Sequence, residues 1–125
     1  MLRACRRVLK AGAPLAFFVV VPAAGLSSRE IERAVEAGPA HVEAGRGYAA
    51  LLRQVGFADI EIVDVTDEYT LTLSASIRVR EVEATQLGDL IGMDVFNEGQ
   101  ADRRRELTAI HDGLLQRHLV SAARP

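Results

Sequence analysis

The chain has 125 residues, of which 49% are apolar, so it is long enough for one domain and too apolar for a disordered protein. The formal net charge of -2 excludes a global positive field of the kind that attracts nucleic acid or anionic membranes, and we expect neither as a partner. Cys5 is the single cysteine, which excludes an internal disulfide and a metal site built on thiolates.

The first 25 residues fit two interpretations. Basic residues at positions 3, 6, 7 and 10 precede an apolar run over residues 11–21 and the small-residue segment Pro22–Gly25, as in a secretory signal peptide. The same residues also predict a helix, a turn and a strand, because apolar residues recur at helical spacing up to Leu9 and are followed by Gly12 and Pro14. The strand would be Leu15–Val21, a continuous apolar run of the kind that parallel sheets bury on both faces.

Two helices and a strand are predicted next. Ser27 precedes an amphipathic stretch with early acidic residues, which is typical of a helix start, and Gly38 ends that helix. Apolar residues at i, i+3, i+4 and i+7 over Tyr48–Val55 predict a second helix, which ends at Gly56. Apolar and acidic residues alternate over residues 59–65, which predicts a strand with one buried face.

The segment after this strand is ambiguous between helix and strand. Thr66 and the two acidic residues after it resemble a helix start. Apolar residues alternate within Thr70–Val82, which favours a strand, but Leu71, Ala75 and Val79 also lie on one helical stripe. The cap and the length of the segment up to residue 91 favour the helix.

One more helix and one more strand are predicted at the C-terminal end. Gly92 separates the preceding segment from an amphipathic helix over Asp102–Leu115, and His118–Ala122 would form a short final strand. The alternation of helices and strands along the whole chain indicates an α/β protein.

Two segments resemble motifs of class I S-adenosylmethionine-dependent methyltransferases. Arg6–Leu15 is similar to the RVLKPGG-x-L segment that joins the helix after the family's fourth strand to the fifth strand. Ala11 and Ala13 stand where the family often has Pro and Gly, which are mild changes for a turn. Tyr48–Phe57 resembles the family's hxxLLxxAGF helix end, and the two motifs occur in the family's order.

The resemblance implies a fold for the whole chain. Residues 1–125 would be a single partial domain, the C-terminal half of a Rossmann-like methyltransferase fold. The strands Leu15–Val21, Ile60–Val65 and Leu119–Ala122 would be the family's fifth, sixth and seventh, which gives a three-stranded sheet of order 5-7-6 with the last strand antiparallel.

The resemblance also implies where the cofactor would bind. The family holds S-adenosylmethionine through a glycine-rich loop after its first strand, which would lie upstream of Met1. Gly45-Arg46-Gly47 follows a polar loop rather than a strand and is interpreted as a turn. We therefore expect S-adenosylmethionine to serve the complete family fold and this chain alone to bind no cofactor.

Residues 22–47 are expected to form an insertion on the acceptor side, because the segments after the family's fifth strand usually help to cover the methyl acceptor. Pro22, Arg46 and Tyr48 are the candidate pocket contacts that follow from this placement. The structural alternative is that Pro22 ends a strand and that Tyr48 packs in the core. No residue matches a catalytic or cofactor-binding position of the family.

Other chemistries have little support in the sequence. His41, His111 and His118 are the only histidines, and they give no ligand set for a metal ion. Arg103–Arg105 could contact a phosphate, but the acidic residues on both sides of the run favour a solvated helix face. Cys5 lies on the apolar face of its predicted helix and is expected to be part of the core.

Two classes of function follow from this sequence. In the first, the chain is a truncated methyltransferase-like protein of the cytoplasm that contributes an acceptor-side scaffold and neither binds the cofactor nor methylates by itself. In the second, it is a non-enzymatic half-domain that self-associates, or a remnant. A small secreted protein with residues 1–25 as signal peptide is a further alternative.

The predicted strand Leu15–Val21 bears on the partners of the chain. In a half-fold it would be a long, hydrophobic and unpaired edge, which proteins usually cover or protect with charge. We therefore expect this strand to pair in trans, either with a second copy in a homo-oligomer or with a missing N-terminal half.

Overall fold

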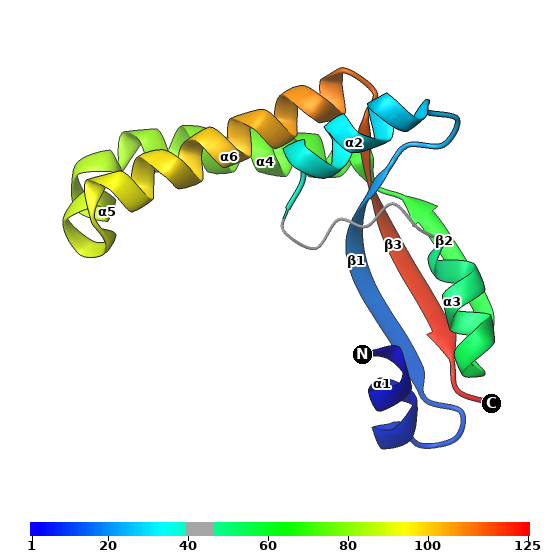
Figure 1. Ribbon diagram of the computed structural model, residues 1–125. Coiled ribbons are helices and arrows are strands. Elements are labelled where there is room, and N and C mark those ends of the chain that lie inside the picture. The colour runs from blue at the N-terminus through cyan, green and yellow to red at the C-terminus, as the bar shows by residue number, and fades with distance from the viewer. Residues whose placement is uncertain (40–46) are drawn as a thin grey trace.

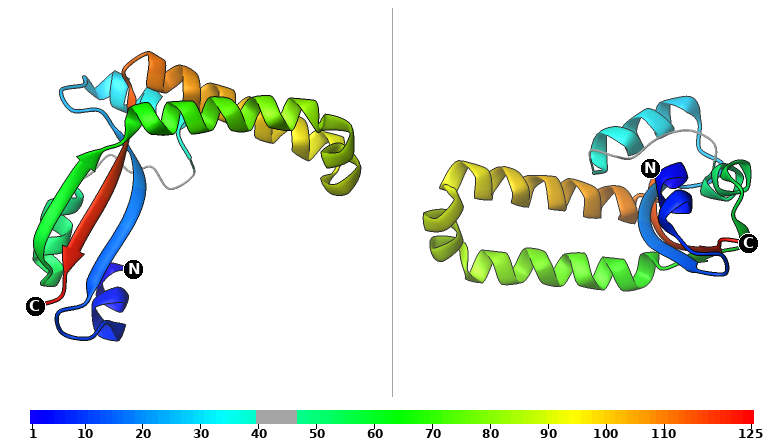
Figure 2. Two further views of the ribbon diagram at one scale, coloured as in Figure 1. Left: turned by 180° about the vertical axis from the view of Figure 1, so that it is seen from behind. Right: turned by 90° about the horizontal axis from the view of Figure 1, so that it is seen from below.

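A computed structural model of the chain describes residues 1–39 and 47–125, which form a body containing a sheet and a long helical arm (Figures 1 and 2). The elements of these residues, in chain order, are α1 (Leu2–Val8), β1 (Pro14–Pro22), α2 (Ser28–Ala37), α3 (Tyr48–Val55), β2 (Ala58–Asp64), α4 (Thr66–Val82), α5 (Ala84–Ile91), α6 (Met93–His111) and β3 (Leu115–Ala123).

The sheet has three strands in the order β1-β3-β2. β3 is antiparallel to both neighbours and pairs with the whole length of β1, from Pro14 opposite Ala123 to Pro22 opposite Leu115. β2 pairs with the other side of β3, with an irregularity in the register between Ala58 and Glu61. This arrangement confirms the predicted sheet of order 5-7-6 with an antiparallel last strand.

Two hydrophobic clusters hold the elements together. In the body, α1 and α3 cover one face of the sheet, and Leu52, Phe57 and Val120 are at the centre of that cluster. The second cluster lies where the arm meets the sheet and includes Ala34 of α2 and Leu115 of β3, together with buried residues of α4 and α6. Both clusters contain residues of β3. This strand therefore packs against the helices of the body and also against the base of the arm.

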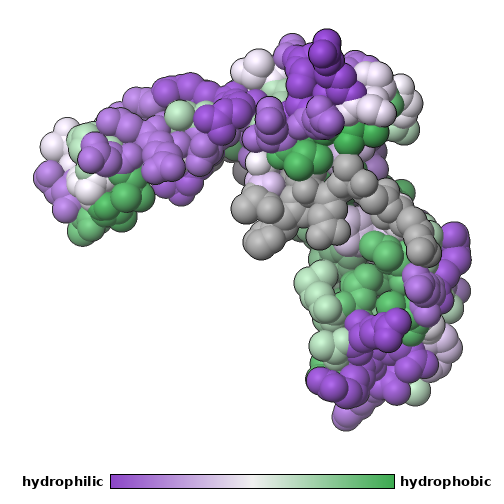
Figure 3. Space-filling model, viewed as in Figure 1, coloured by the Kyte–Doolittle hydropathy of each residue, from purple (hydrophilic) through white to green (hydrophobic). Residues whose placement is uncertain are grey.

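The arm consists of α4 and α6 side by side, with α5 at the far end (Figures 1 and 2). Gln100 of α6 is only 1% exposed, and its amide nitrogen donates hydrogen bonds to the Ile77 carbonyl oxygen and to Oε1 of Glu81, both on α4. Apolar side chains gather at the end of the arm in Figure 3, where Leu90, Ile91 and Met93 are exposed. No helix among residues 1–39 and 47–125 is long and apolar enough to cross a membrane.

Polar contacts fix the start of α4 and the base of the arm. The Asp64 carboxylate accepts hydrogen bonds from the backbone N–H of Thr66 at 2.9 Å and from its hydroxyl, which lowers the pKa of Asp64. The Tyr69 hydroxyl donates a hydrogen bond of 2.6 Å to Oε1 of Glu106, a buried residue of α6. This bond joins α4 to α6 close to the sheet.

The helices agree with the sequence-based expectation in one ambiguous segment and differ from it elsewhere. Residues 70–82 belong to the helix α4, which is the interpretation that the sequence favours, so the alternative strand is wrong, and Glu83 separates α4 from α5. The last helix begins at Met93 rather than at Asp102. It also ends earlier than predicted, because Gly113 has a φ of +75° and the chain turns there into β3. β3 in turn is longer than the predicted strand His118–Ala122.

The N-terminal residues form the predicted helix, turn and strand. α1 is followed by Gly12, which has a φ of +81°, and then by β1. β1 pairs with β3 along its whole length, so residues 14–22 are an integral part of the sheet.

We predict that Ser27→Ala destabilises the protein by about 1 kcal/mol, because it removes one half of a reciprocal helix cap. The Ser27 hydroxyl accepts the Glu30 backbone N–H at 3.2 Å, and Oε1 of Glu30 accepts the Ser27 backbone N–H at 3.0 Å. Urea unfolding measures the change in free energy. Ser28→Ala, one residue inside α2, is the control, and an equal loss in both variants would contradict this account.

We predict that Tyr69→Phe lowers the free energy of unfolding by about 1–3 kcal/mol, because it leaves the buried Glu106 carboxylate without its hydroxyl donor while keeping the aromatic ring. The same substitution should cost less in a Glu106→Gln background, where no buried charge remains. A double-mutant cycle by urea unfolding measures this coupling. Additive effects of the two substitutions would show that the bond does not stabilise the base of the arm.

Candidate functional site

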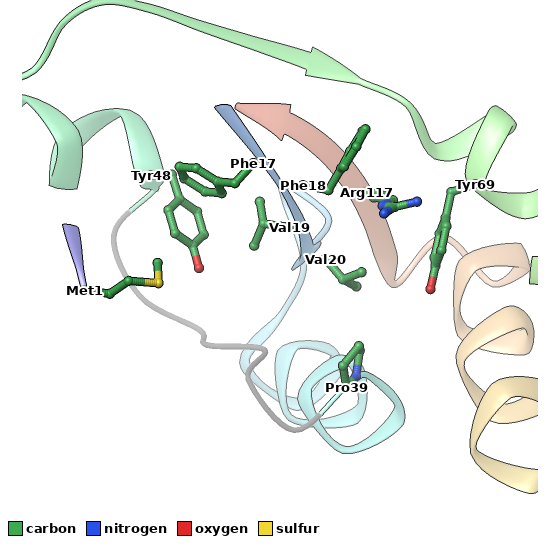
Figure 4. Close-up of a pocket in the computed structure, with 9 residues that line it drawn as sticks. All are labelled: Met1, Phe17, Phe18, Val19, Val20, Pro39, Tyr48, Tyr69 and Arg117. Carbon is green, nitrogen blue, oxygen red and sulfur yellow. The ribbon is translucent and has the colours of Figure 1, made fainter. Parts of the chain in front are cut away.

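A hollow of about 430 Å³ lies along the free edge of β1 (Figure 4). It is bounded by residues from β1, β3, α3, α4 and the chain around α1 and α2. The lining residues are Met1, Phe17, Phe18, Val19, Val20, Pro39, Tyr48, Tyr69 and Arg117.

The hollow follows an unpaired strand edge. Its lining includes the four consecutive residues Phe17–Val20, whose side chains point alternately to the two faces of the sheet. β3 occupies one side of β1, and no strand of the described residues occupies the other. A further strand would lie about 4.8 Å from β1 in the plane of the sheet. Among residues 1–39 and 47–125, the side of β1 that follows the hollow therefore has no partner strand.

On one face of the sheet, the hollow has an aromatic wall. The rings of Phe17 and Tyr48 meet edge to face, with centroids 5.4 Å apart and an interplanar angle of 65°. Both residues pack against the cluster around Leu52 that joins α1 and α3 to the sheet. This wall is fixed by the core of the body rather than by loops.

On the other face, the Arg117 guanidinium lies between two aromatic rings. Its Cζ atom is 4.3 Å from the ring centroid of Phe18 and 4.4 Å from that of Tyr69. The backbone of Arg117 is held on both sides, because its N–H donates to Oγ1 of Thr66 at 3.1 Å and its carbonyl oxygen accepts the Val65 N–H at 2.9 Å. The position of the guanidinium is thus set by the sheet, by α4 and by the link between them.

Tyr69 connects this guanidinium to the arm. Burial raises the pKa of the Tyr69 hydroxyl, and the hydrogen bond to Glu106 raises it further. The hydroxyl therefore stays protonated and directs its proton to the Glu106 carboxylate. Among residues 1–39 and 47–125, no carboxylate forms an ion pair with Arg117. The face carries a positive charge on an aromatic surface.

The three sequence-predicted pocket residues lie in different places. Tyr48 lines the hollow and also packs against the core cluster of the body. Pro22 is the last residue of β1, opposite Leu115, and is not one of the residues that line the hollow. Arg46 lies outside the described residues, as does most of the loop within the predicted insertion 22–47, whose described part contains α2.

Sequence reasoning missed Phe18, Tyr69 and Arg117. The predicted final strand began at His118, whereas β3 begins at Leu115 and contains Arg117. If the predicted strand is extended by three residues, the alternation puts Arg117 on the same face as Leu119. In the structure, Leu119 is the residue of β3 that lies opposite Phe18. No local signal in the sequence brings Tyr69 to this face.

No group of three or more His, Cys, Asp or Glu side chains in the described part of the chain could hold a metal ion. Of the three histidines, His41 lies outside that part, and His118 has its Nε2 atom 3.0 Å from Oε1 of Gln116. Arg105 of the basic run pairs with Asp102 at 3.1 Å, and Arg104 pairs with Glu81 of α4.

Comparison with protein-family models finds no match, and comparison with curated proteins finds no relative. Among solved structures, phosphoethanolamine N-methyltransferase 2 of Haemonchus contortus, in complex with phosphomonomethylethanolamine and S-adenosylhomocysteine, matches 99% of this chain with a TM-score of 0.79 and 16% identity. The same enzyme in complex with S-adenosyl-L-methionine matches with a TM-score of 0.77 and 17% identity. A protein of Galdieria sulphuraria named as a sarcosine dimethylglycine methyltransferase matches 98% of this chain with a TM-score of 0.80 and 12% identity.

The matches cover nearly all of this chain but only part of the other proteins. The chain spans 29% of the length of the Haemonchus enzyme and 46% of the Galdieria protein. At these identities the likeness concerns the fold. It agrees with the family that the motifs at Arg6–Leu15 and Tyr48–Phe57 resemble. This chain therefore has the fold of part of the S-adenosylmethionine-dependent methyltransferases.

Proposed function

We propose that the chain is part of a methyltransferase that uses S-adenosylmethionine, and that it contributes a scaffold on the side of the methyl acceptor. The observation that carries this proposal is the extent of the structural likeness. Nearly every residue of the chain has a counterpart in solved methyltransferases, yet the chain corresponds to less than half of their length. The rest of such a fold would have to supply the cofactor site.

The two edges of the sheet support this proposal because they differ in chemistry. β2 has three acidic residues, Asp59, Glu61 and Asp64, and a register irregularity, which are common protections of an exposed edge. β1 has no charged residue from Pro14 to Pro22. This contrast is expected if the sheet ends at β2 and continues beyond β1.

The residues of the hollow do not fit the cofactor itself. A nucleoside-containing cofactor is held by close backbone approach at glycines and by a carboxylate that accepts hydrogen bonds from the ribose hydroxyls. Among residues 1–39 and 47–125, the nine that line the hollow include neither a glycine nor a carboxylate. S-adenosylmethionine is therefore assigned to the part of the fold beyond the edge of β1, and no step of the reaction is assigned to residues of this chain.

A cytoplasmic location belongs to the same proposal. Removal of residues 1–25 as a signal peptide would delete α1 and β1, and with β1 every backbone bond on one side of β3. The protein would lose a strand that contributes to both of its hydrophobic clusters. The place of these residues in the sheet therefore favours residues 1–25 as part of the folded domain over their interpretation as a signal peptide.

A second candidate is a non-enzymatic half-domain that self-associates. The same uncharged edge of β1 favours it, because two copies could pair through this strand as well as one copy with a further half. The two candidates differ in the partner of β1 and agree that β1 is paired.

We predict that the 125-residue chain alone gives no saturable binding of S-adenosylmethionine or S-adenosylhomocysteine, because the residues of its hollow lack the groups that hold a nucleoside. Isothermal titration calorimetry measures this directly. Saturable binding in the micromolar range by the isolated chain would contradict the assignment of the cofactor to another part of the fold.

We also predict that the isolated chain self-associates through β1. Ala16→Lys places a charge on the exposed face of β1 and should shift the chain toward monomer, because lysines on an edge strand oppose pairing. Val63→Lys is the matched control on β2, where Val63 is 47% exposed. Sedimentation velocity measures the distribution of species, and a folded wild-type chain that is strictly monomeric would overturn the proposed pairing.

A further inference from the structure

Arg117 has the features of a binding residue for an anion. It is half-buried, its guanidinium lies between the rings of Phe18 and Tyr69, and it lines the hollow. We propose that Arg117 binds the anionic group, a phosphate monoester or a carboxylate, of a small acceptor molecule. This inference rests on the proposed methyltransferase function and names the substrate class for the same site.

The stacking leaves the donors of the guanidinium available. The Cζ atom of Arg117 lies over the centres of both rings, at 4.3 Å and 4.4 Å, and such cation–π contacts do not use the N–H donors of the guanidinium. Contact with two rings restricts the side chain, so less freedom is lost when an oxyanion binds to two donors at once. The largely apolar lining of the hollow strengthens such a charge-assisted contact.

The neighbouring carboxylates already have other partners. Glu106 accepts the hydrogen bond of the Tyr69 hydroxyl, and this bond holds the carboxylate at the base of the arm. Asp64, which lies opposite His118 in the sheet, accepts two hydrogen bonds from Thr66. Within residues 1–39 and 47–125, the side chain of Arg117 has stacking partners but no hydrogen-bond acceptor and no ion-pair partner.

A strand paired with β1 would not occupy the position of the Arg117 guanidinium. A strand added at the edge lies in the plane of the sheet, beside β1. The guanidinium instead lies over the ring of Phe18, on the face of the sheet, next to Tyr69 of the arm (Figure 4). The proposed anion site and the proposed strand pairing therefore use different parts of the hollow.

The proteins of similar fold support this class of ligand. One is in complex with phosphomonomethylethanolamine, and the other is named for sarcosine and dimethylglycine. By their chemistry these are small amines that also have a phosphate or a carboxylate group. A single guanidinium that approaches such a molecule from the sheet would hold its anionic end.

The test is a titration of the isolated chain, followed by nuclear magnetic resonance of the backbone and arginine side-chain N–H signals. The probes are phosphoethanolamine, sarcosine and inorganic phosphate, with ethanolamine as the probe that lacks an anionic group. We expect at least one anionic probe to shift the Arg117 signals saturably and ethanolamine to leave them unchanged. Binding of phosphoethanolamine but not sarcosine would assign a phosphate site, and the reverse would assign a carboxylate site.

Two variants and a matched control complete the experiment. Arg117→Gln should weaken binding about tenfold or more, because it removes a charged donor of the anion. Arg117→Lys keeps the charge but loses the planar fork, and should bind with intermediate affinity. Arg78→Gln, which makes the same charge change on the exposed side of α4, should bind like the wild type.

The outcomes separate this inference from the function on which it rests. Unchanged affinity in Arg117→Gln, or no saturable binding of any anionic probe by the wild type, would overturn the anion site. Neither result would affect the sheet edge or the cofactor titration. If Arg117→Gln fails to fold, the Arg117→Lys variant tests the anion site instead. Wild-type affinity in a folded Arg117→Lys chain would exclude a contact through two guanidinium donors.

Discussion

The pairing of β3 between β1 and β2 is the interaction on which the rest of this structure depends. β1 and β2 do not pair with each other, and each reaches the sheet only through β3. Both hydrophobic clusters include residues of this strand, Leu115 at the base of the arm and Val120 in the body. The last strand of the chain thus pairs with residues near its beginning, so the sheet is held together by contacts between distant parts of the sequence.

The same topology leaves β1 with a partner strand on one side only among residues 1–39 and 47–125. β3 satisfies one side of the strand, and the other side keeps its backbone groups and its apolar residues without a partner strand in the described chain. Buried backbone groups need hydrogen-bond partners, and uncharged edges invite pairing. The hollow along this edge, the proposed continuation of the sheet and the alternative of self-association are consequences of this one constraint.

The base of the arm contacts the candidate site. α4 has one apolar stripe that packs toward α6, with Leu73 and Ile77, and a second, exposed stripe with Leu71, Val79 and Val82. Tyr69 lies at the base of the first stripe, where its hydroxyl contacts Glu106 of the arm and its ring contacts Arg117 of the sheet. Tyr69 thus joins the arm to the guanidinium, in addition to the hydrogen bond from the Arg117 backbone N–H to Thr66 of α4.

The sequence by itself determined the elements whose signals are local. The apolar run of β1, the alternation in β2, the cap at Ser27 and the stop at Gly56 each depend on a few adjacent residues, and the two motifs were sufficient to place the strands in the correct order. Tertiary structure decided the rest. α6 begins at Met93, well before the predicted start, and contains the buried Gln100, which bonds to α4. Leu115 belongs to β3, although its spacing in the sequence continues the apolar pattern of the helix before it. The site with Phe18, Tyr69 and Arg117 joins three distant segments, because the alignment of β1 with β3 and the docking of α4 are set by packing over long range, which no local pattern records.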